Sequence, residues 1–146
     1  MKINFKKLFI SIFITFAFGL LFSFFIHDFD TSNISIIPSY VFPIVWTILY
    51  FLMGISFYII TESTSQSKEK AIIFYILQLI FNSLWTLFFF GLKLYTFSFV
   101  WIILLIILVV LMITEFYKIN KVAAYLNIPY FIWLLIASKI LFNFLV

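Results

Sequence analysis

Residues Ala71–Phe90 read AIIFYILQLIFNSLWTLFFF, a stretch of 20 residues without a charged side chain. An α-helix rises about 1.5 Å per residue, so about 20 apolar residues cross the roughly 30 Å hydrocarbon core of a bilayer. Four other stretches have the same character and are separated by short polar loops. The sequence therefore predicts an all-α membrane protein, a five-transmembrane-helix bundle in one domain (residues 1–146), with helices at approximately Leu8–Ile26, Val41–Ile60, Ala71–Phe90, Tyr95–Tyr117 and Ala123–Val146.

The composition supports this class and excludes several kinds of chemistry. The chain is 66% hydrophobic and 10% charged, whereas soluble domains carry about 25% charged residues. It has no cysteine and one histidine, which excludes disulfides, thiolate catalysis and multi-histidine metal centres. No phosphate-binding loop, HExxH motif or Ser-His-Asp arrangement indicates kinase or hydrolase chemistry. The loop group His27, Asp28 and Asp30 is too sparse to predict a metal site.

Lysine placement predicts the orientation of the helices, because positively charged loops favour the cytoplasmic side. Seven lysines fall in the N-terminus and in the second and fourth loops, whereas Lys93 and Lys139 lie toward the other side. The N-terminus is therefore expected in the cytoplasm. Heavy use of lysine, isoleucine and asparagine without arginine suggests a bacterial plasma membrane. Lys139 either reaches the headgroups or pairs with Asp28, Asp30 or an acidic group of a ligand.

The first predicted helix could instead be a signal peptide, since three lysines precede it. Its apolar stretch is longer than usual for such a peptide, and the residues that follow offer no small-x-small cleavage site. We therefore expect a retained helix.

Two amides share one face of the third predicted helix. Gln78, Asn82, Trp85 and Phe89 follow one another at steps of four, three and four residues, which places them on one helical face. Polar groups in the bilayer core are costly, so this face is expected to turn inward. Two roles remain open: the amides bond to neighbouring helices, at about 1 kcal/mol each, or they contact a ligand.

Aromatic residues form similar faces on the second and fifth predicted helices. An interfacial belt is an alternative for Trp46, Trp85 and Trp101. Trp133 lies mid-helix, where a belt does not explain it, so its indole either packs in the bundle or lines a cavity. The small Ala137 one turn later either leaves room beside this indole or forms a packing notch. The two faces comprise Pro43, Trp46, Tyr50 and Phe57 in the second helix, and Tyr130, Trp133 and Ala137 in the fifth.

Three of these segments resemble one known family. PSYVFPIVWTILYFLMG (Pro38–Gly54) resembles the signature of the TspO/MBR family, also called tryptophan-rich sensory protein, translocator protein or peripheral-type benzodiazepine receptor. QLIFNSLWTLFFFGL (Gln78–Leu92) resembles the family's third helix, and FYKINKVAAYLNIPYFIWLLIAS (Phe116–Ser138) its fourth loop and fifth helix. The resemblance runs in order and with matching spacing from about Pro38 to the C-terminus.

This resemblance implies an internal ligand cavity within five helices that often pair as a homodimer. The implied ligands are protoporphyrin IX, haem-type tetrapyrroles and similar flat hydrophobic molecules, with a role in tetrapyrrole sensing, regulation or transport. No obligatory cofactor and no nucleic-acid partner are expected. The implied cavity residues are Trp46, Asn82, Trp133 and Ala137, with Tyr50 and Trp85 as additions.

Two other function classes stay open. The first is a light-dependent porphyrin-degrading enzyme, in which Trp46 and Trp133 would donate electrons to the excited ring. The second is a lipid or sterol transporter, although the sterol-associated ending of animal members is missing here.

The first loop also departs from the family, with Tyr40 where tryptophan is common. A porphyrin's propionates would need water or a cation, for which Lys93 or Lys139 is the candidate.

Overall fold

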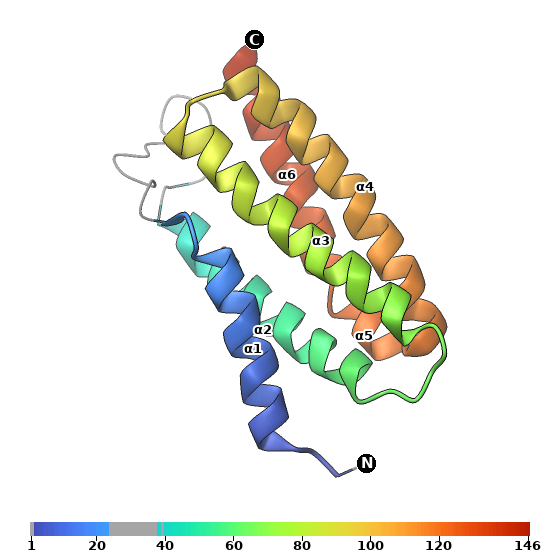
Figure 1. Cartoon of the computed structure of the whole chain (residues 1–146). Helices are drawn as coiled ribbons and strands as arrows, with labels where there is room; N and C mark the ends of the chain where they lie inside the picture. Colours follow the sequence, from blue (N-terminus) through green and yellow to red (C-terminus); the bar gives the residue numbers. More distant parts are fainter. Residues whose placement is uncertain (1, 24–37, 39) are drawn as a thin grey trace.

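The computed structural model of the protein describes residues 2–23, 38 and 40–146. Every regular element in these residues is helical, which confirms the predicted all-α class (Figure 1). In chain order the elements are α1 (Phe5–Gly19), α2 (Val41–Thr61), α3 (Lys68–Thr86), the π-helical turn η2 (Leu87–Gly91), α4 (Tyr95–Ile119), α5 (Lys121–Tyr125) and α6 (Ile128–Leu145).

The long helices lie side by side and alternate in direction, with the N-terminus at one end of the bundle and the C-terminus at the other (Figure 1). α1 has 15 residues and is about 22 Å long, which is shorter than the hydrocarbon core. Within the described residues, four helical stretches are long and apolar enough to cross a bilayer: Val41–Thr61, Lys68–Gly91, Tyr95–Ile119 and Lys121–Leu145. These four correspond to the second to fifth predicted helices.

The first helix differs from its predicted bounds, Leu8–Ile26, at both ends. It begins at Phe5 because the side chain of Asn4 caps it, accepting a hydrogen bond from the backbone N–H of Lys7 at 3.2 Å. It ends at Gly19. The residues at the predicted C-terminal bound lie outside the described part of the chain.

Neighbouring helices hold the C-terminal end of α1. The last carbonyls of an α-helix have no partner within the helix. The Ser83 hydroxyl of α3 donates to the carbonyl of Phe18, and the Tyr50 hydroxyl of α2 donates to the carbonyl of Gly19 at 3.3 Å. These hydrogen bonds, which a hydropathy pattern does not register, allow the helix to end inside an apolar stretch.

The third predicted helix, Ala71–Phe90, begins earlier and changes its winding near its end. It begins at Lys68, and from Leu87 to Gly91 the backbone is π-helical. The N–H of Leu92 donates to the carbonyl of Leu87 at 2.9 Å, a step of five residues instead of four. The wider turn changes which way the side chains of its residues face.

The fifth predicted helix, Ala123–Val146, is two helices in the structure. α5 and α6 meet at Asn127, and Pro129 lacks the N–H that would continue the α-helical hydrogen bonds. The carbonyl of Ala123 accepts from the Ser56 hydroxyl at 2.9 Å and from Nδ2 of Asn127 at 3.0 Å. The predicted apolar span is confirmed, but its prediction as one continuous helix is wrong, because hydrogen bonds from other side chains stabilise the break.

Polar and aromatic contacts join the helices in the interior. The Tyr130 hydroxyl of α6 donates to Oε1 of Gln78 in α3 at 2.8 Å. The rings of Phe57 in α2 and Tyr75 in α3 stack at 4.3 Å, and the Tyr75 hydroxyl is hydrogen-bonded to Thr15 in α1. All five side chains are buried. The predicted inward face of the third helix is thus confirmed at Gln78.

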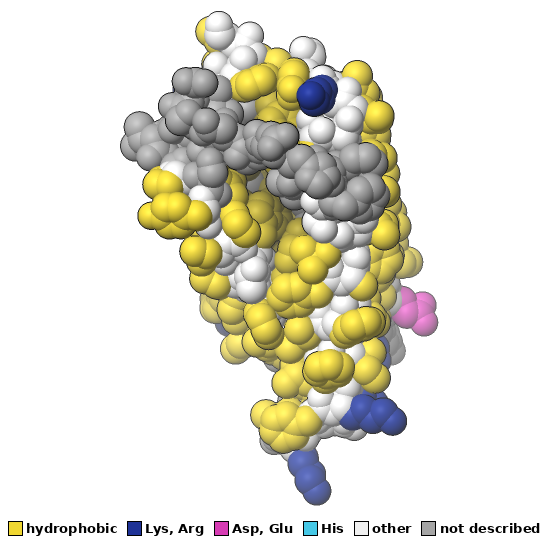
Figure 2. Space-filling view, turned by 90° about the vertical axis from the view of Figure 1, so that its left-hand side faces the viewer, with side chains coloured by type: hydrophobic (Ala, Val, Ile, Leu, Met, Phe, Trp, Pro, Cys, Tyr) yellow, Lys and Arg dark blue, Asp and Glu magenta, His cyan; other side chains and the backbone are white. Residues whose placement is uncertain are grey.

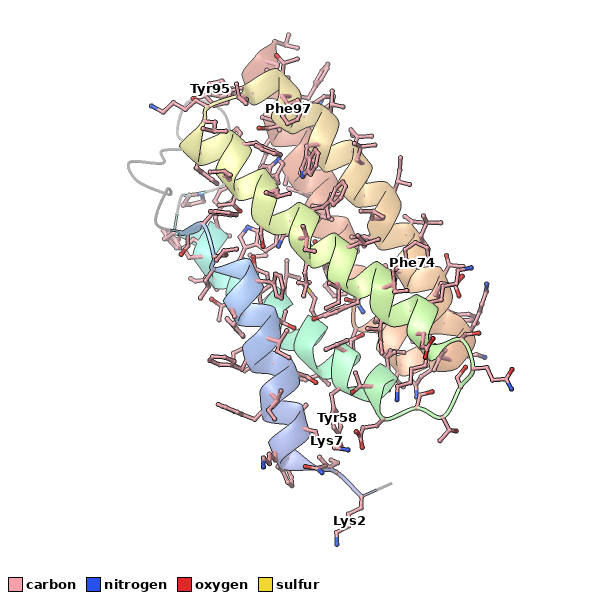
Figure 3. The ribbon with its side chains drawn as sticks, viewed as in Figure 1. Lys2, Lys7, Tyr58, Phe74, Tyr95 and Phe97 are labelled. Atoms are coloured by element: carbon pink, nitrogen blue, oxygen red, sulfur yellow. The ribbon has the colours of Figure 1, made fainter. Side chains whose placement is uncertain are left out.

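Charged side chains gather at the end of the bundle that carries the N-terminus. Figure 2 shows a face that is largely hydrophobic between its ends, and Figure 3 places Lys7 beside the lower end of α2. Lys7 pairs with Glu62 at 3.3 Å. Glu115 pairs with Lys70 at 3.4 Å and with Lys118 at 3.1 Å. Lys118 lies three residues after Glu115, a spacing at which opposite charges pair on one face of a helix.

Candidate functional site

A pocket of about 630 Å³ lies at the end of the bundle that carries the C-terminus, and none of the described residues that line it is charged. Four helical regions build its walls. They contribute Phe16, Gly19, Leu20 and Ser23 from α1 and the turn after it; Phe42, Pro43, Trp46, Thr47 and Tyr50 from α2; Trp85, Thr86, Phe89 and Phe90 from α3 and η2; and Trp133, Ala137, Ile140 and Leu141 from α6.

Five of the six predicted binding residues line this pocket, and the sixth lies behind its wall. Asn82 is 2% exposed and does not line the pocket. Its Nδ2 donates to the hydroxyl of Tyr50 at 3.2 Å. Both amides on this face of α3 therefore bond to side chains of neighbouring helices, as Gln78 does with Tyr130. The five lining residues are Trp46, Tyr50, Trp85, Trp133 and Ala137.

Three tryptophans from three helices meet at the pocket, and the fourth lies outside it. Trp46 of α2, Trp85 of α3 and Trp133 of α6 all line it. Trp101 instead packs on α3: its ring stacks on that of Phe81 at 4.3 Å, and its Nε1–H donates to the carbonyl of Phe81 at 2.8 Å. Trp133 is only 7% exposed, so its mid-helix indole forms part of a cavity wall.

Ring contacts close the side of the pocket between α2 and α6. The centroids of Phe42 and Trp133 are 5.4 Å apart, and those of Trp46 and Tyr130 are 6.1 Å apart. Within α2, Trp46 lies 5.4 Å from Tyr50, one helical turn away. Aromatic pairs at such separations attract one another through their quadrupoles as well as by burial. Phe42 has no counterpart among the predicted site residues, although it lies one turn before Trp46 on the same face.

The π-helical turn η2 adds a further ring to the aromatic wall that α3 forms. The rings of Trp85 and Phe89 are nearly parallel, at 5.2 Å and 4°. Phe90, the next residue, also lines the pocket and meets Phe89 edge to face at 4.8 Å. The predicted α-helical face reached Phe89 and missed Phe90, because a spacing of 3.6 residues per turn does not allow for a π turn.

Gly19 allows α1 to pack closely against Tyr50 of α2. A Cβ placed on Gly19 would lie only 2.3 Å from Cζ of Tyr50. The Tyr50 hydroxyl donates to the Gly19 carbonyl and accepts from Asn82, so it joins α1, α2 and α3 at the pocket wall. The sequence did not point to Gly19, since its role depends on where α1 ends.

The serine and threonine hydroxyls around the pocket are bonded to their own segments of the chain. Ser23 donates to the carbonyl of Leu20 and Thr47 to that of Pro43, each at 2.8 Å, while Thr86 donates to that of Asn82 at 3.4 Å. The surface offered to a ligand is therefore mainly apolar. Nε1 of Trp85 and of Trp133 is buried and has no hydrogen-bond partner in the described part of the chain.

The lysines at this end do not line the pocket. Lys139 is exposed, and its Nζ lies 5.6 Å from the ring centroid of Phe142. Lys93, in the turn between η2 and α4, is also exposed. Among the described residues no cluster of His, Asp and Glu could hold a metal ion. The segment His27–Asp30, which contains the acidic partners considered for Lys139, lies outside the described residues.

Comparison with known proteins places this arrangement in a family. The model of the TspO/MBR family matches residues 11–146. The chain belongs to the TspO/MBR family. The match includes most of α1, whereas the motifs recognised in the sequence begin at Pro38. Family membership and the apolar helical stretches together show an integral membrane protein.

Curated relatives in the TspO/MBR family bear related names. "Tryptophan-rich sensory protein" of Cereibacter sphaeroides is 33% identical over 106 residues, which cover 73% of this chain and 66% of the relative. "Tryptophan-rich protein TspO" of Archaeoglobus fulgidus is 42% identical over 107 residues, covering 72% and 68%. "Protein CrtK" of Rhodobacter capsulatus is 29% identical over 109 residues, covering 73% and 68%. The alignments thus span about two thirds of each relative.

Proposed function

We propose that this TspO/MBR protein binds a porphyrin or a similar flat hydrophobic ligand in the pocket, with a role in tetrapyrrole sensing, regulation or transport. One observation carries the proposal: indoles from α2, α3 and α6 line one pocket of about 630 Å³. Ligand pockets in proteins commonly measure about 300–1,000 Å³. A porphyrin offers two flat π-faces for stacking on indole and phenyl rings, and its rim is mostly apolar.

The polar groups of such a ligand would sit at the edge of the pocket. Because the described lining residues carry no charge, we expect the two propionates of protoporphyrin to remain at the membrane surface. Lys93 and Lys139 are the exposed lysines at this end of the bundle. An acceptor atom of the ligand that reached Nε1 of Trp85 or Trp133 would supply the partner that these atoms lack.

We further propose that the segment around α1 completes a fifth span, in the plasma membrane of a bacterium. The N-terminal segment, the first turn of α3 and the α4–α5 junction together carry seven lysines and lie at one end of the bundle, which supports a cytoplasmic location for that end (Figure 1). The protein is expected to pair as a homodimer in the membrane. It is expected to need no resident cofactor.

Titration with protoporphyrin IX in detergent tests the binding proposal. The ligand should quench tryptophan fluorescence saturably, because three of the four indoles lie around the pocket. Replacement Trp133→Ala should weaken binding by at least about tenfold, since it removes a ring that forms the wall. Trp101→Phe is the matched control, because Trp101 lies outside the pocket. Equal affinities for the two variants would reject the assignment.

The pair Trp46 and Trp133 favours a second candidate, a light-dependent porphyrin-degrading enzyme. Both indoles line the pocket and are placed to donate an electron to an excited ring held there, with dioxygen as the oxidant. Illumination of the aerobic complex should then bleach the Soret band in the wild type and not when both residues are phenylalanine. A Soret band that stays constant in the light would leave binding as the activity.

A further inference from the structure

Among the described lining residues of the pocket, the exposed ones all lie between α1 and α2. Of its 17 lining residues, three are exposed: Leu20, Pro43 and Thr47. Leu20 follows α1 directly, and the other two lie in the first two turns of α2. Every lining residue from α3, η2 and α6 is buried or partly buried. The described walls therefore leave an opening between the end of α1 and the first turns of α2.

Packing explains why the helices separate at this level. Nearer the N-terminal end of α1 the two helices are in close contact, and a Cβ on Gly54 would lie 2.7 Å from Cα of Ile12. The last close contact of this kind is that of Gly19 with Tyr50. Beyond it α1 has ended, its final carbonyls being held by Ser83 and Tyr50. Among the described residues, no helix then lies against the first turns of α2 on this side.

Aromatic contacts close the side of the pocket between α2 and α6. There α6 faces α2 through two ring pairs, Phe42 with Trp133 and Trp46 with Tyr130. Passage between α2 and α6 would require these aromatic contacts to separate. Passage between α1 and α2 requires no such change among the described residues.

The surroundings of the opening are apolar. Next to its rim, Leu21, Ile44 and Ile48 are each more than half exposed, at 52%, 55% and 54%. Among the side chains coloured by type in Figure 2, hydrophobic ones predominate on this face, which is the left-hand side of Figure 1. In a membrane protein such a surface is covered by acyl chains, and the rim residues carry no charge. The opening thus meets lipid rather than an aqueous funnel.

We propose that the ligand enters and leaves the pocket laterally, from the acyl-chain region of the bilayer, through the opening bounded by Leu20, Pro43 and Thr47. This inference rests on the proposed binding function and adds the route by which the site is filled. A flat hydrophobic molecule partitions into lipid before it meets the protein. Its ring can slide edge-on between the two helices while its charged groups remain at the headgroups.

A pair of single-cysteine variants tests the route, because the natural chain has no cysteine. Thr47→Cys places a thiol on the rim, and Ile48→Cys places one on the next residue, which is exposed but does not line the pocket. Each protein is reconstituted in vesicles of zwitterionic phospholipid and compared before and after reaction with a bulky maleimide. Stopped-flow fluorescence then follows the transfer of protoporphyrin IX from the vesicle lipid into the pocket.

Labelling at residue 47 should slow both association and dissociation by about tenfold or more, while labelling at residue 48 should change neither rate by more than about twofold. Because both rates fall together, the dissociation constant should change less than either rate. Equal rates for the two labelled proteins would overturn the lateral route.

A second measurement separates this inference from the proposed function. If the unlabelled protein did not bind protoporphyrin at all, the proposed function would be wrong, and the opening would still be testable with lipid. Phospholipids brominated near the headgroup end of their acyl chains should quench pocket tryptophans through the opening. The label at residue 47 should reduce that quenching relative to the label at residue 48, and identical quenching would refute the opening.

Discussion

The two ends of this helical bundle are built differently. At the end that carries the N-terminus, the helices meet through stacked rings such as Phe57 on Tyr75 and through ion pairs such as Lys70 with Glu115. At the other end they separate around a pocket of about 630 Å³. We call these the closed end and the pocket end. We therefore expect the closed end to contribute more to the free energy of unfolding than the pocket end.

The same contrast extends to hydrogen bonding. In the interior toward the closed end, buried groups bond across helices, as Ser56 does with the carbonyl of Ala123 and Tyr130 with Gln78. In the pocket walls, the hydroxyls of Thr47 and Thr86 instead donate to carbonyls of their own helices. Bonds between helices fix the distances between them, whereas bonds within a helix leave those distances free. Tyr50 is the exception, because its hydroxyl joins α1 and α3 at the pocket itself.

The largest expected effect comes from removing a ring at the closed end. Tyr75 is fully buried between Phe57 and Phe116, so Tyr75→Ala should lower the free energy of unfolding by about 3–5 kcal/mol. Thermal unfolding in detergent, followed by circular dichroism, measures this loss. Trp85→Ala is the comparison at the pocket end, and it should cost clearly less because one side of its ring already faces a void. A larger loss for Trp85→Ala would reverse the assigned roles of the two ends.

A pair of glycine substitutions has the next largest effect and separates stability from binding. Both Gly19→Ala and Gly54→Ala insert a methyl group into the α1–α2 contact and should each cost about 1–3 kcal/mol. Only Gly19→Ala meets the ring of Tyr50, so only this variant should also weaken protoporphyrin binding several-fold.

A spectroscopic signal checks the glycine pair without any ligand. Trp46 lies 5.4 Å from Tyr50, so its indole N–H resonance should shift in Gly19→Ala, while that of Trp101 should not. With 15N-labelled tryptophan the chain gives four such resonances, which single replacements can assign. A Trp46 resonance that moved equally in Gly54→Ala would show that Tyr50 is not specifically displaced.

The parts of the site that the sequence could predict lie on regular α-helix. Trp46, Tyr50, Trp133 and Ala137 line the pocket, as the helical faces and the family resemblance together indicated. Asn82 also faces inward as predicted, but it lies behind Tyr50. Periodicity gives the direction of a side chain and does not say which of two inward side chains covers the other.

The unpredicted parts depend on irregular backbone or on tertiary contacts. Phe90 faces the pocket because of the π turn, which no repeat of polar and apolar residues reveals. Gly19 matters because α1 ends there, and that end is held by Ser83 and Tyr50 from other helices. The break at Asn127 likewise depends on Ser56, 71 positions earlier. Each of these features requires knowledge of partners far away in the sequence.

The smallest expected effect concerns the charged rim of the closed end. Glu115 pairs with both Lys70 and Lys118, whose side chains are 63% and 58% exposed. Lys118→Gln leaves Glu115, whose side chain is 10% exposed, paired with Lys70. An ion pair made by an exposed lysine contributes about 0.2–1 kcal/mol, so the loss of stability should stay below about 1 kcal/mol. The same thermal measurement at low and at moderate salt checks this value. If Lys118→Gln instead approached the loss caused by Tyr75→Ala, the stability of the closed end would come from its charges and not from its buried rings. Its contrast with the pocket end would then have to be explained by electrostatics at the membrane surface.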